Sequence, residues 1–337
     1  MKLMPLRLLA AVTTAFALIA ASQAQADMCG KPAETDKITV VADWLPWASQ
    51  GPFYAASMKG FYKDEGLTVD IVSPATSTDP IKLVARERAE FSMTYVPDIM
   101  AARDTGIPVT SVAAMLRPLA YGMIVAPELG ITSPAGFKGK TVGVSAIPAT
   151  RAYFDSMLAS ANLTEADMSV VDPGYSNVTM LEAGKLSAIS GLSYSELMSA
   201  NEQRAKDGKP NFLYWPFTAY GVPNFYFMVL AGNDSWLKDH PAATCRFLRA
   251  TEKGYHEFAA NPDVYNKFFA EKNDVFNLQD HANMTKLTMQ DWLSADGKLF
   301  TQDESVWSTA QDWALKMKLI SIESKPDDYF TNAYLPE

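Results

Sequence analysis

One segment of the sequence, from Asp43 to Gly66, constrains the fold most, because it combines turn residues, aromatic residues and a short helical pattern. The β-branched run at 38–41 before it predicts a buried strand, and the alternating run at 67–72 after it predicts a second strand. Prolines and glycines predict a loop over 43–52, and small and aromatic residues at helical spacing predict a helix over 53–59. This order of elements indicates an α/β sheet, in which ligands bind beyond the carboxyl ends of the strands.

Three aromatic residues, Trp44, Trp47 and Tyr54, lie on this loop or just after it. Because the loop follows the carboxyl end of a predicted strand, we expect the three rings to form a wall of a pocket for a flat, unsaturated ligand. The alternative for each ring is a place in the hydrophobic core.

The same segment resembles the opening of the NMT1/THI5-like group of solute-binding proteins, which reads D-W-x-P-N-x-x-H-x-x-x-Y and then G-(F/Y)-(Y/F)-x-x-E-G-L. The residues that match this pattern are Asp43, Trp44, Pro46, Tyr54, Gly60, Phe61, Tyr62, Glu65, Gly66 and Leu67. Trp47 stands where the pattern has asparagine, and Gln50 stands where it has histidine. The resemblance implies a type II periplasmic binding-protein fold, in which two α/β lobes are joined by two chain crossings with a ligand cleft between them.

Two later segments extend the resemblance. The run YGVPNFY at 220–226 is similar to the G-V-P-N-Y-Y run of the thiamine-pyrimidine and riboflavin-precursor branch, and its Asn224 offers a donor and an acceptor to a heterocycle. Glu196 falls on an acidic position of the family, where a carboxylate can accept hydrogen bonds from an aminopyrimidine. The alternatives are a solvated helix residue for Glu196 and a simple bend at 220–226.

The resemblance also implies a division of the chain. We expect residues 27–118 and 235–337 to form the first lobe and residues 119–234 to form the second, with crossings near 117–121 and near Asn233.

Four more residues complete the predicted ligand site. Tyr95 and Asp98 follow a predicted strand at 91–95, and Tyr175 lies in a turn, so we expect all three at the cleft. We expect Gln50 to orient the ligand.

The amino-terminal residues have the pattern of a secretory signal. Lys2 and Arg7 precede an apolar run at 8–20, and an A-x-A sequence ends at Ala26. The run is too short to span a bilayer, so we expect residues 1–26 to be a cleaved signal peptide of a periplasmic protein. In that oxidising compartment the two cysteines, at positions 29 and 245, form either a disulfide or two separate thiols.

Charge and cysteine content exclude other classes. The chain has 29 Lys and Arg against 38 Asp and Glu, a formal net charge of −9, which disfavours nucleic acid as a partner. With two cysteines there is no C-x-x-C metal pair, and we expect no cofactor.

The predicted function is that of the substrate-binding component of an ABC importer. As a monomer, the protein would capture a thiamine-precursor pyrimidine or a riboflavin-like compound by hinge closure and pass it to the permease and ATPase subunits. One alternative ligand is a quaternary amine, held by the aromatic rings with Asp43, Asp98 or Glu196. Another is a sulfonate or nitrate at the helix that follows 145–150.

A third alternative is an enzyme, since some members of the group synthesise the thiamine pyrimidine. Those members use an active-site histidine and a cysteine-rich iron site. Here Gln50 replaces the histidine, and His240, His256 and His281 all fall on predicted carboxyl-terminal helices. We therefore expect no enzymatic activity.

Overall fold

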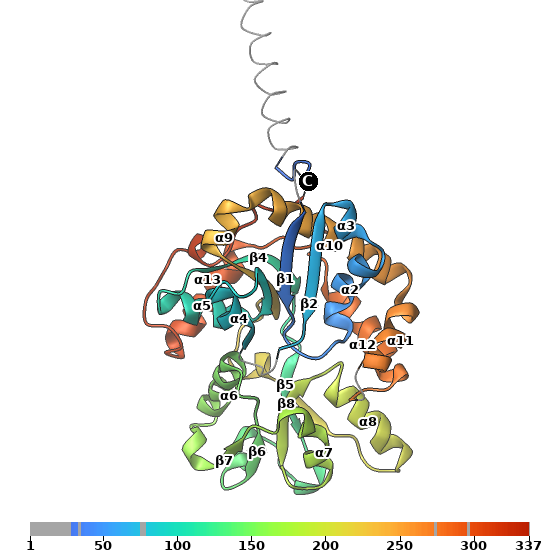
Figure 1. Cartoon of the computed structure of the whole chain (residues 1–337). Helices are drawn as coiled ribbons and strands as arrows, with labels where there is room; N and C mark the ends of the chain where they lie inside the picture. Colours follow the sequence, from blue (N-terminus) through green and yellow to red (C-terminus); the bar gives the residue numbers. More distant parts are fainter. Residues whose placement is uncertain (1–27, 33–34, 75–78, 273–274, 295–296, 337) are drawn as a thin grey trace, which may run out of the picture.

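The computed structural model describes residues 28–32, 35–74, 79–272, 275–294 and 297–336. These residues form two lobes, each built on a five-stranded sheet, which lie one above the other in Figure 1. The predicted signal peptide at 1–26 lies outside the described residues. In the described part of the chain, no helix has both the length and the apolar composition needed to cross a membrane.

The sheet of the first lobe has the order β2-β1-β3-β10-β4. Its strands are β1 (Asp36–Val41), β2 (Leu67–Val72), β3 (Phe91–Thr94), β4 (Val109–Leu116) and β10 (Met228–Asn233). β1 is parallel to β2 and β3, whereas β10 is antiparallel to both β3 and β4.

The sheet of the second lobe repeats this mixed arrangement in the order β7-β6-β8-β5-β9. Its strands are β5 (Tyr121–Val125), β6 (Thr141–Gly143), β7 (Ser169–Val171), β8 (Ala188–Leu192) and β9 (Leu213–Pro216). β6 is parallel to β7 and β8, and β5 is antiparallel to β8 and β9.

Helices surround both sheets (Figure 1). Those of the first lobe are α2 (Gly51–Met58), α3 (Phe61–Asp64), α4 (Asp79–Ala85), α5 (Val96–Asp104), α9 (Asp234–Asp239), α10 (Pro241–Ala260), α11 (Pro262–Lys272), α12 (Leu278–Thr288) and α13 (Glu304–Lys316). Those of the second lobe are α6 (Pro148–Ser160), α7 (Asn177–Glu182) and α8 (Glu196–Lys206). The predicted strand, loop, helix and strand of the opening segment correspond to β1, the loop with the 3₁₀ turn η1 (Ala48–Gln50), α2 and β2.

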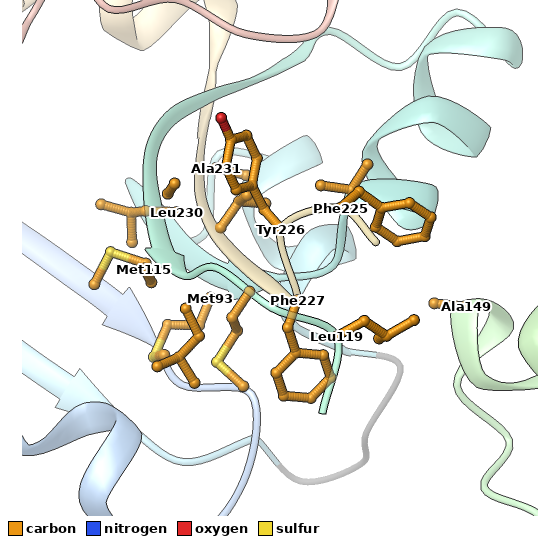
Figure 2. Packing of buried hydrophobic residues seen from close by; sticks show 14 of the residues in the cluster. Met93, Met115, Leu119, Ala149, Phe225, Tyr226, Phe227, Leu230 and Ala231 are labelled. Carbon is orange, nitrogen blue, oxygen red and sulfur yellow. The ribbon is translucent and has the colours of Figure 1, made fainter. Parts of the chain in front are cut away.

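The two sheets are joined by the segments 117–120, between β4 and β5, and 217–227, between β9 and β10. The segments bond to each other: the Phe227 amide donates to the Arg117 carbonyl at 3.2 Å, and the Leu119 amide donates to Asn224 Oδ1 at 3.1 Å. Figure 2 shows apolar side chains of both segments, among them Leu119, Phe225 and Phe227, in one buried cluster. We call this paired, packed connection the hinge segment.

The second crossing differs from its expected position near Asn233. The strand Met228–Asn233 pairs with β3 and β4 along its length, so it belongs to the first sheet and the chain crosses before it. The expected second lobe at 119–234 therefore includes one strand of the first. An apolar strand shows in the sequence that it is buried, but not in which of two sheets.

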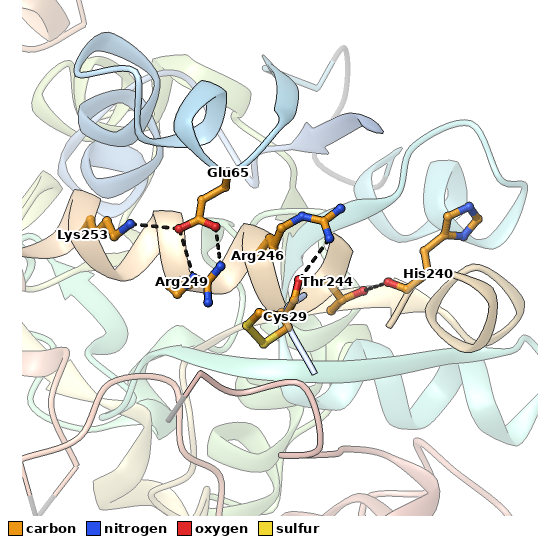
Figure 3. Close-up of a disulfide and its surroundings, with 8 residues drawn as sticks. Cys29, Glu65, His240, Thr244, Arg246, Arg249 and Lys253 are labelled. Atoms are coloured by element: carbon orange, nitrogen blue, oxygen red, sulfur yellow. Dashed lines mark hydrogen bonds and ion pairs between the residues drawn. A yellow bond between two sulfur atoms is a disulfide. The ribbon is translucent and has the colours of Figure 1, made fainter. Parts of the chain in front are cut away.

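A group of residues that we call the amino-terminal clamp ties Cys29 and Glu65 to α10 (Figure 3). It consists of Cys29, Glu65, Cys245, Arg246, Arg249 and Lys253. Cys29 and Cys245 form a disulfide across 216 residues, which decides between the two alternatives for the cysteines. Glu65 accepts hydrogen bonds from Arg249 Nε at 3.0 Å and Lys253 Nζ at 2.9 Å. Arg246 Nη1 donates to the Cys29 carbonyl at 3.0 Å.

Candidate functional site

A cavity at the carboxyl ends of β1, β3 and β8 receives side chains from both lobes, and we call it the cleft cavity. Its lining residues are Asp43, Trp44, Trp47, Tyr95, Tyr121, Ile147, Leu192, Ser195, Glu196, Phe227 and Phe276. Its volume is about 50 Å³. A second cavity of about 260 Å³, the side cavity, shares Asp43 and Tyr95 with it and extends between α4 and α5. Both cavities lie beyond the carboxyl ends of strands, which is where open α/β sheets bind ligands.

Asp43 is the buried acid on the first-lobe wall of the cleft cavity. Gln50 Nε2 donates to its Oδ1 at 2.6 Å, and the Tyr95 hydroxyl donates to its Oδ2 at 3.4 Å. Burial raises the pKa of Asp43 to about 6, against the lowering effect of these hydrogen bonds. The carboxylate is thus oriented by neutral donors and has no basic partner among them.

Gln50 lies behind this wall rather than in it. Its side chain is fully buried, and its Oε1 accepts from the Trp47 amide at 2.9 Å. Gln50 is not among the residues that line the cleft cavity. The structure therefore does not support a direct contact between Gln50 and the ligand. Gln50 holds Asp43 and the loop in place from inside the protein.

Glu196 supplies an acid on the second-lobe wall. It is the first residue of α8, and its Oε2 accepts from the Leu192 amide at 3.0 Å and from the Ser195 hydroxyl. Asn177 Nδ2 donates to Oε1 at 3.5 Å. These contacts place Glu196 in the cavity wall and not on a solvated helix face.

The predicted aromatic residues divide between the cavity and the core. Trp44, Trp47 and Tyr95 line the cleft cavity, and their contact with a ligand stays a prediction. Tyr54 instead packs against α11, with its ring centroid 5.1 Å from that of Phe268 and 5.7 Å from that of Phe269. The expectation that Tyr54 lines the pocket is not supported, because α11 covers this face of α2. The spacing of residues around the loop carries no information about that distant helix.

The remaining predicted residues lie in three different places. Asn224 is exposed and bonds the Leu119 amide at the hinge, outside the cavity lining. Tyr175 is part of the 3₁₀ turn η5 (Gly174–Ser176), and its side chain is outside the described part of the structure. Asp98 lines the side cavity, where its Oδ1 accepts from the Ala149 amide of the second lobe at 3.1 Å. Burial raises the pKa of Asp98 to about 7.

Several cavity residues were missed at the sequence level. Tyr121 is the first residue of β5, and Phe227 immediately precedes β10. Their rings are stacked at an angle of 25°, with centroids 6.0 Å apart. Tyr121 ends the crossing predicted at 117–121, and Phe227 lies at the second crossing, so a position at a crossing is the signal that could have indicated both. Ile147, Leu192, Ser195 and Phe276 carry no sequence signal that we can identify.

Histidine and metal chemistry find little support at this site. His281 is fully buried on α12, and its ring centroid lies 6.1 Å from that of Phe276. Burial lowers the pKa of His281 to about 4, so the ring is neutral near pH 7. Within the described ranges, no group of three or more His, Cys, Asp or Glu residues is placed to hold a metal ion.

A family model described as NMT1/THI5 like matches residues 47–264. The chain belongs to the NMT1/THI5-like family. A formylaminopyrimidine-binding protein from Halalkalibacterium halodurans is 27% identical over 313 residues, which cover 90% of this chain and 92% of the relative. A 4-amino-5-hydroxymethyl-2-methylpyrimidine phosphate synthase from Saccharomyces cerevisiae is 26% identical over 234 residues, 68% of each chain.

The fold of this NMT1/THI5-like protein is also that of solved binding proteins. The alkanesulfonate-binding protein SsuA from Xanthomonas axonopodis pv. citri superposes with a TM-score of 0.65 at 10% identity, over 89% of this chain and 99% of that one. The predicted family and the predicted two-lobed α/β binding-protein fold are therefore confirmed.

Proposed function

We propose that this NMT1/THI5-like protein is the substrate-binding component of an ABC importer and binds a small aminopyrimidine of the thiamine-precursor type. The observation that carries the proposal is the pair of acids, Asp43 and Glu196, on opposite walls of one aromatic-lined cavity. Carboxylates accept hydrogen bonds from ring amino groups, and the surrounding rings contact a planar heterocycle. The printed name of the relative from Halalkalibacterium halodurans supports the same ligand class.

The charges of the cavity argue against an anionic ligand. Among the described residues that line the cleft cavity, none is a lysine or an arginine. The amino end of α6, where a sulfonate or nitrate could bind backbone amides, already donates the Ala149 amide to Asp98. A protein carboxylate thus occupies the position that an anion would need.

Cavity size supports capture by movement of the lobes. The cleft cavity holds about 50 Å³, whereas an engineered cavity of about 150 Å³ takes up benzene. A pyrimidine ring therefore does not fit the cleft cavity at this size, and we expect the lobes to move apart at the segments 117–120 and 217–227 to admit it. Closure then buries the ligand between Asp43 and Glu196.

A binding role fits this chain better than the synthase activity named for the yeast relative. Gln50 stands where the family pattern has histidine, and its side chain is buried and bonded to Asp43 and to the Trp47 amide. The other parts of the proposal are a periplasmic location directed by residues 1–26, a monomeric state, and permease and ATPase partners. The fold of SsuA-type binding proteins supports this setting.

The test is a thermal-shift screen of the protein without residues 1–26, followed by calorimetry. The probes are 4-amino-5-hydroxymethyl-2-methylpyrimidine, a formylaminopyrimidine, riboflavin, choline and an alkanesulfonate. At 100 times its dissociation constant, a specific ligand stabilises the fold by about 2.7 kcal/mol. We expect this stabilisation with the two pyrimidines, and we expect NMR to show that they remain chemically unchanged after incubation with the protein. Stabilisation by choline or the sulfonate alone, or conversion of the pyrimidine, would overturn the proposal.

A further inference from the structure

We propose that the indole N–H of Trp47 recognises a hydrogen-bond acceptor on the ligand, and that the ligand therefore presents a ring acceptor beside its amino group. This inference rests on the proposed function. It restricts the proposed aminopyrimidine ligands to those with a ring acceptor next to the amino group. It also gives a role to the residue at which this chain departs from the asparagine of the family pattern.

The evidence begins with an unpaired polar atom. Trp47 is 5% exposed and lines the cleft cavity, and its Nε1 is buried with no hydrogen-bond partner among the described residues. The two acids of the same cavity, Asp43 and Glu196, both have partners. Trp292 and Trp307 also have a buried indole N–H without a partner among the described residues, but neither lines the cleft cavity. Because buried donors in native proteins nearly always have an acceptor, we infer that at Trp47 a ligand in the cavity supplies it.

The contacts of Trp47 place the residue between the two lobes. Gln50 Oε1 holds the Trp47 amide at 2.9 Å, so the residue is anchored to the first lobe. The indole stacks on Tyr194 of the second lobe, with ring centroids 6.0 Å apart and an angle of 24° between the rings. Trp47 therefore lies where the lobes meet, inside the region that closes around a ligand.

This position links recognition to closure. When the lobes separate, the contact with Tyr194 is broken and the indole N–H can bond to water. When they close on an empty cleft, the N–H loses water and gains no partner, which disfavours the empty closed form. A ligand with an acceptor at this point removes that cost and shifts the equilibrium towards closure.

The donors and acceptors of the walls define the matching edge of the ligand. Asp43 and Glu196 accept hydrogen bonds, so they bind amino groups, whereas Trp47 donates and needs an acceptor. A ring nitrogen next to an exocyclic amino group offers this combination. The quaternary nitrogen of choline carries no N–H for the two acids, and its only acceptor is a hydroxyl two carbons away, so the inference also predicts that choline binds more weakly than the pyrimidine.

The experiment measures three probes by calorimetry on the wild type and on Trp47→Phe. The probes are 4-amino-5-hydroxymethyl-2-methylpyrimidine and the two aminopyridines made from it by replacing one ring nitrogen with C–H. We expect Trp47→Phe to weaken binding of the pyrimidine ten- to a hundredfold. We expect the aminopyridine that lacks the ring nitrogen next to the amino group to bind the wild type weaker by a similar factor and to be affected less than threefold by the substitution.

Trp44→Phe is the matched control, because Trp44 lines the same cavity. It should change the affinities of all three probes by the same factor. If Trp47→Phe also changes all three equally, or none, the inference is wrong while the proposed function stands. If the wild type binds no probe, the proposed function itself fails. The three probes on the wild type alone remain a test should a variant misfold, since equal affinities would overturn the inference.

Discussion

The amino-terminal clamp and the cleft both bury an acidic side chain, but they treat its charge in opposite ways. Burial alone would raise the pKa of Glu65, yet hydrogen bonds and charges from Arg249 and Lys253 outweigh it and lower that pKa. In the cleft, Asp43 has the neutral donors Gln50 and Tyr95, and burial raises its pKa to about 6.

We interpret the difference as one between residues that stabilise the fold and residues that the proposed function assigns to the ligand. The clamp satisfies its charges within the chain, so it contributes to the stability of the first lobe. The cleft holds Asp43 at some cost to the free energy of folding, a pattern typical of binding sites. Asp98 follows the cleft pattern, with its pKa raised to about 7 by burial and with the Ala149 amide as its partner.

Removing the disulfide should produce the largest change in stability. The bond between Cys29 and Cys245 closes a loop of 216 residues, and loss of a native disulfide costs about 2–5 kcal/mol. We expect Cys29→Ser with Cys245→Ser to lower the free energy of unfolding in urea by this amount and to leave the affinity for an aminopyrimidine within threefold of the wild type. A large loss of affinity at unchanged stability would show that the clamp and the cleft are not separate.

Asp43→Asn should produce the largest change in binding. Asparagine keeps the Oδ1 acceptor for Gln50 but removes the charge that faces the ligand. We expect affinity for 4-amino-5-hydroxymethyl-2-methylpyrimidine to fall ten- to a hundredfold, about 1.4–2.7 kcal/mol. Calorimetry measures the loss, and a change below threefold would remove Asp43 from the site.

The same substitution should stabilise the empty protein, and only above pH 4. The pKa of Asp43 is about 6 in the folded chain against 3.8 as its ordinary value. Between these values the folded state binds the extra proton, so the contribution of Asp43 to stability falls as pH rises and stays low above pH 6. The advantage of Asp43→Asn should therefore be absent at pH 4 and reach on the order of 3 kcal/mol at pH 7.5. A constant advantage at every pH would contradict this.

The sequence predicted those parts of the site that local pattern determines. Turn residues and hydrophobic alternation placed the loop after β1, and with it Asp43, Trp44 and Trp47, at the carboxyl end of a strand. The family pattern marked Glu196 as an acidic position of the site, and the structure places it at the start of α8 in the opposite wall of the cavity.

The places of the other predicted site residues depend on packing between segments far apart in the sequence. A local sequence pattern carries no information about such packing. Tyr54 faces α11 because Phe268 and Phe269, more than 200 residues later, cover that side of α2. Gln50 is turned inward by its bonds to Asp43 and Trp47.

Glu65→Gln should have a smaller effect than Asp43→Asn, with the opposite dependence on pH. The side chains of Arg249 and Lys253 are 36% and 47% exposed, so solvent screens part of their attraction to Glu65. We expect a loss of about 1 kcal/mol at pH 7. The folded pKa of Glu65 is lowered, so its contribution is present at neutral pH and disappears as pH falls through that pKa. Urea unfolding at pH 7 and pH 3 measures both, and equal losses at the two values would contradict the pairing.

Asn224→Ala should have the smallest effect on stability. It tests whether the hinge segment only stabilises the fold, like the clamp, or also contacts the ligand, like the cleft. The Asn224 side chain accepts from the Leu119 amide at 3.1 Å, a single neutral hydrogen bond at an exposed residue. We expect the free energy of unfolding to fall by at most about 1 kcal/mol and affinity for the aminopyrimidine to stay within threefold. Leu119 is 5% exposed, so its amide is left in apolar surroundings and the loss should be measurable. If affinity instead falls as far as in Asp43→Asn while stability is unchanged, Asn224 reaches the ligand in the closed form, and the hinge segment then belongs to the binding site.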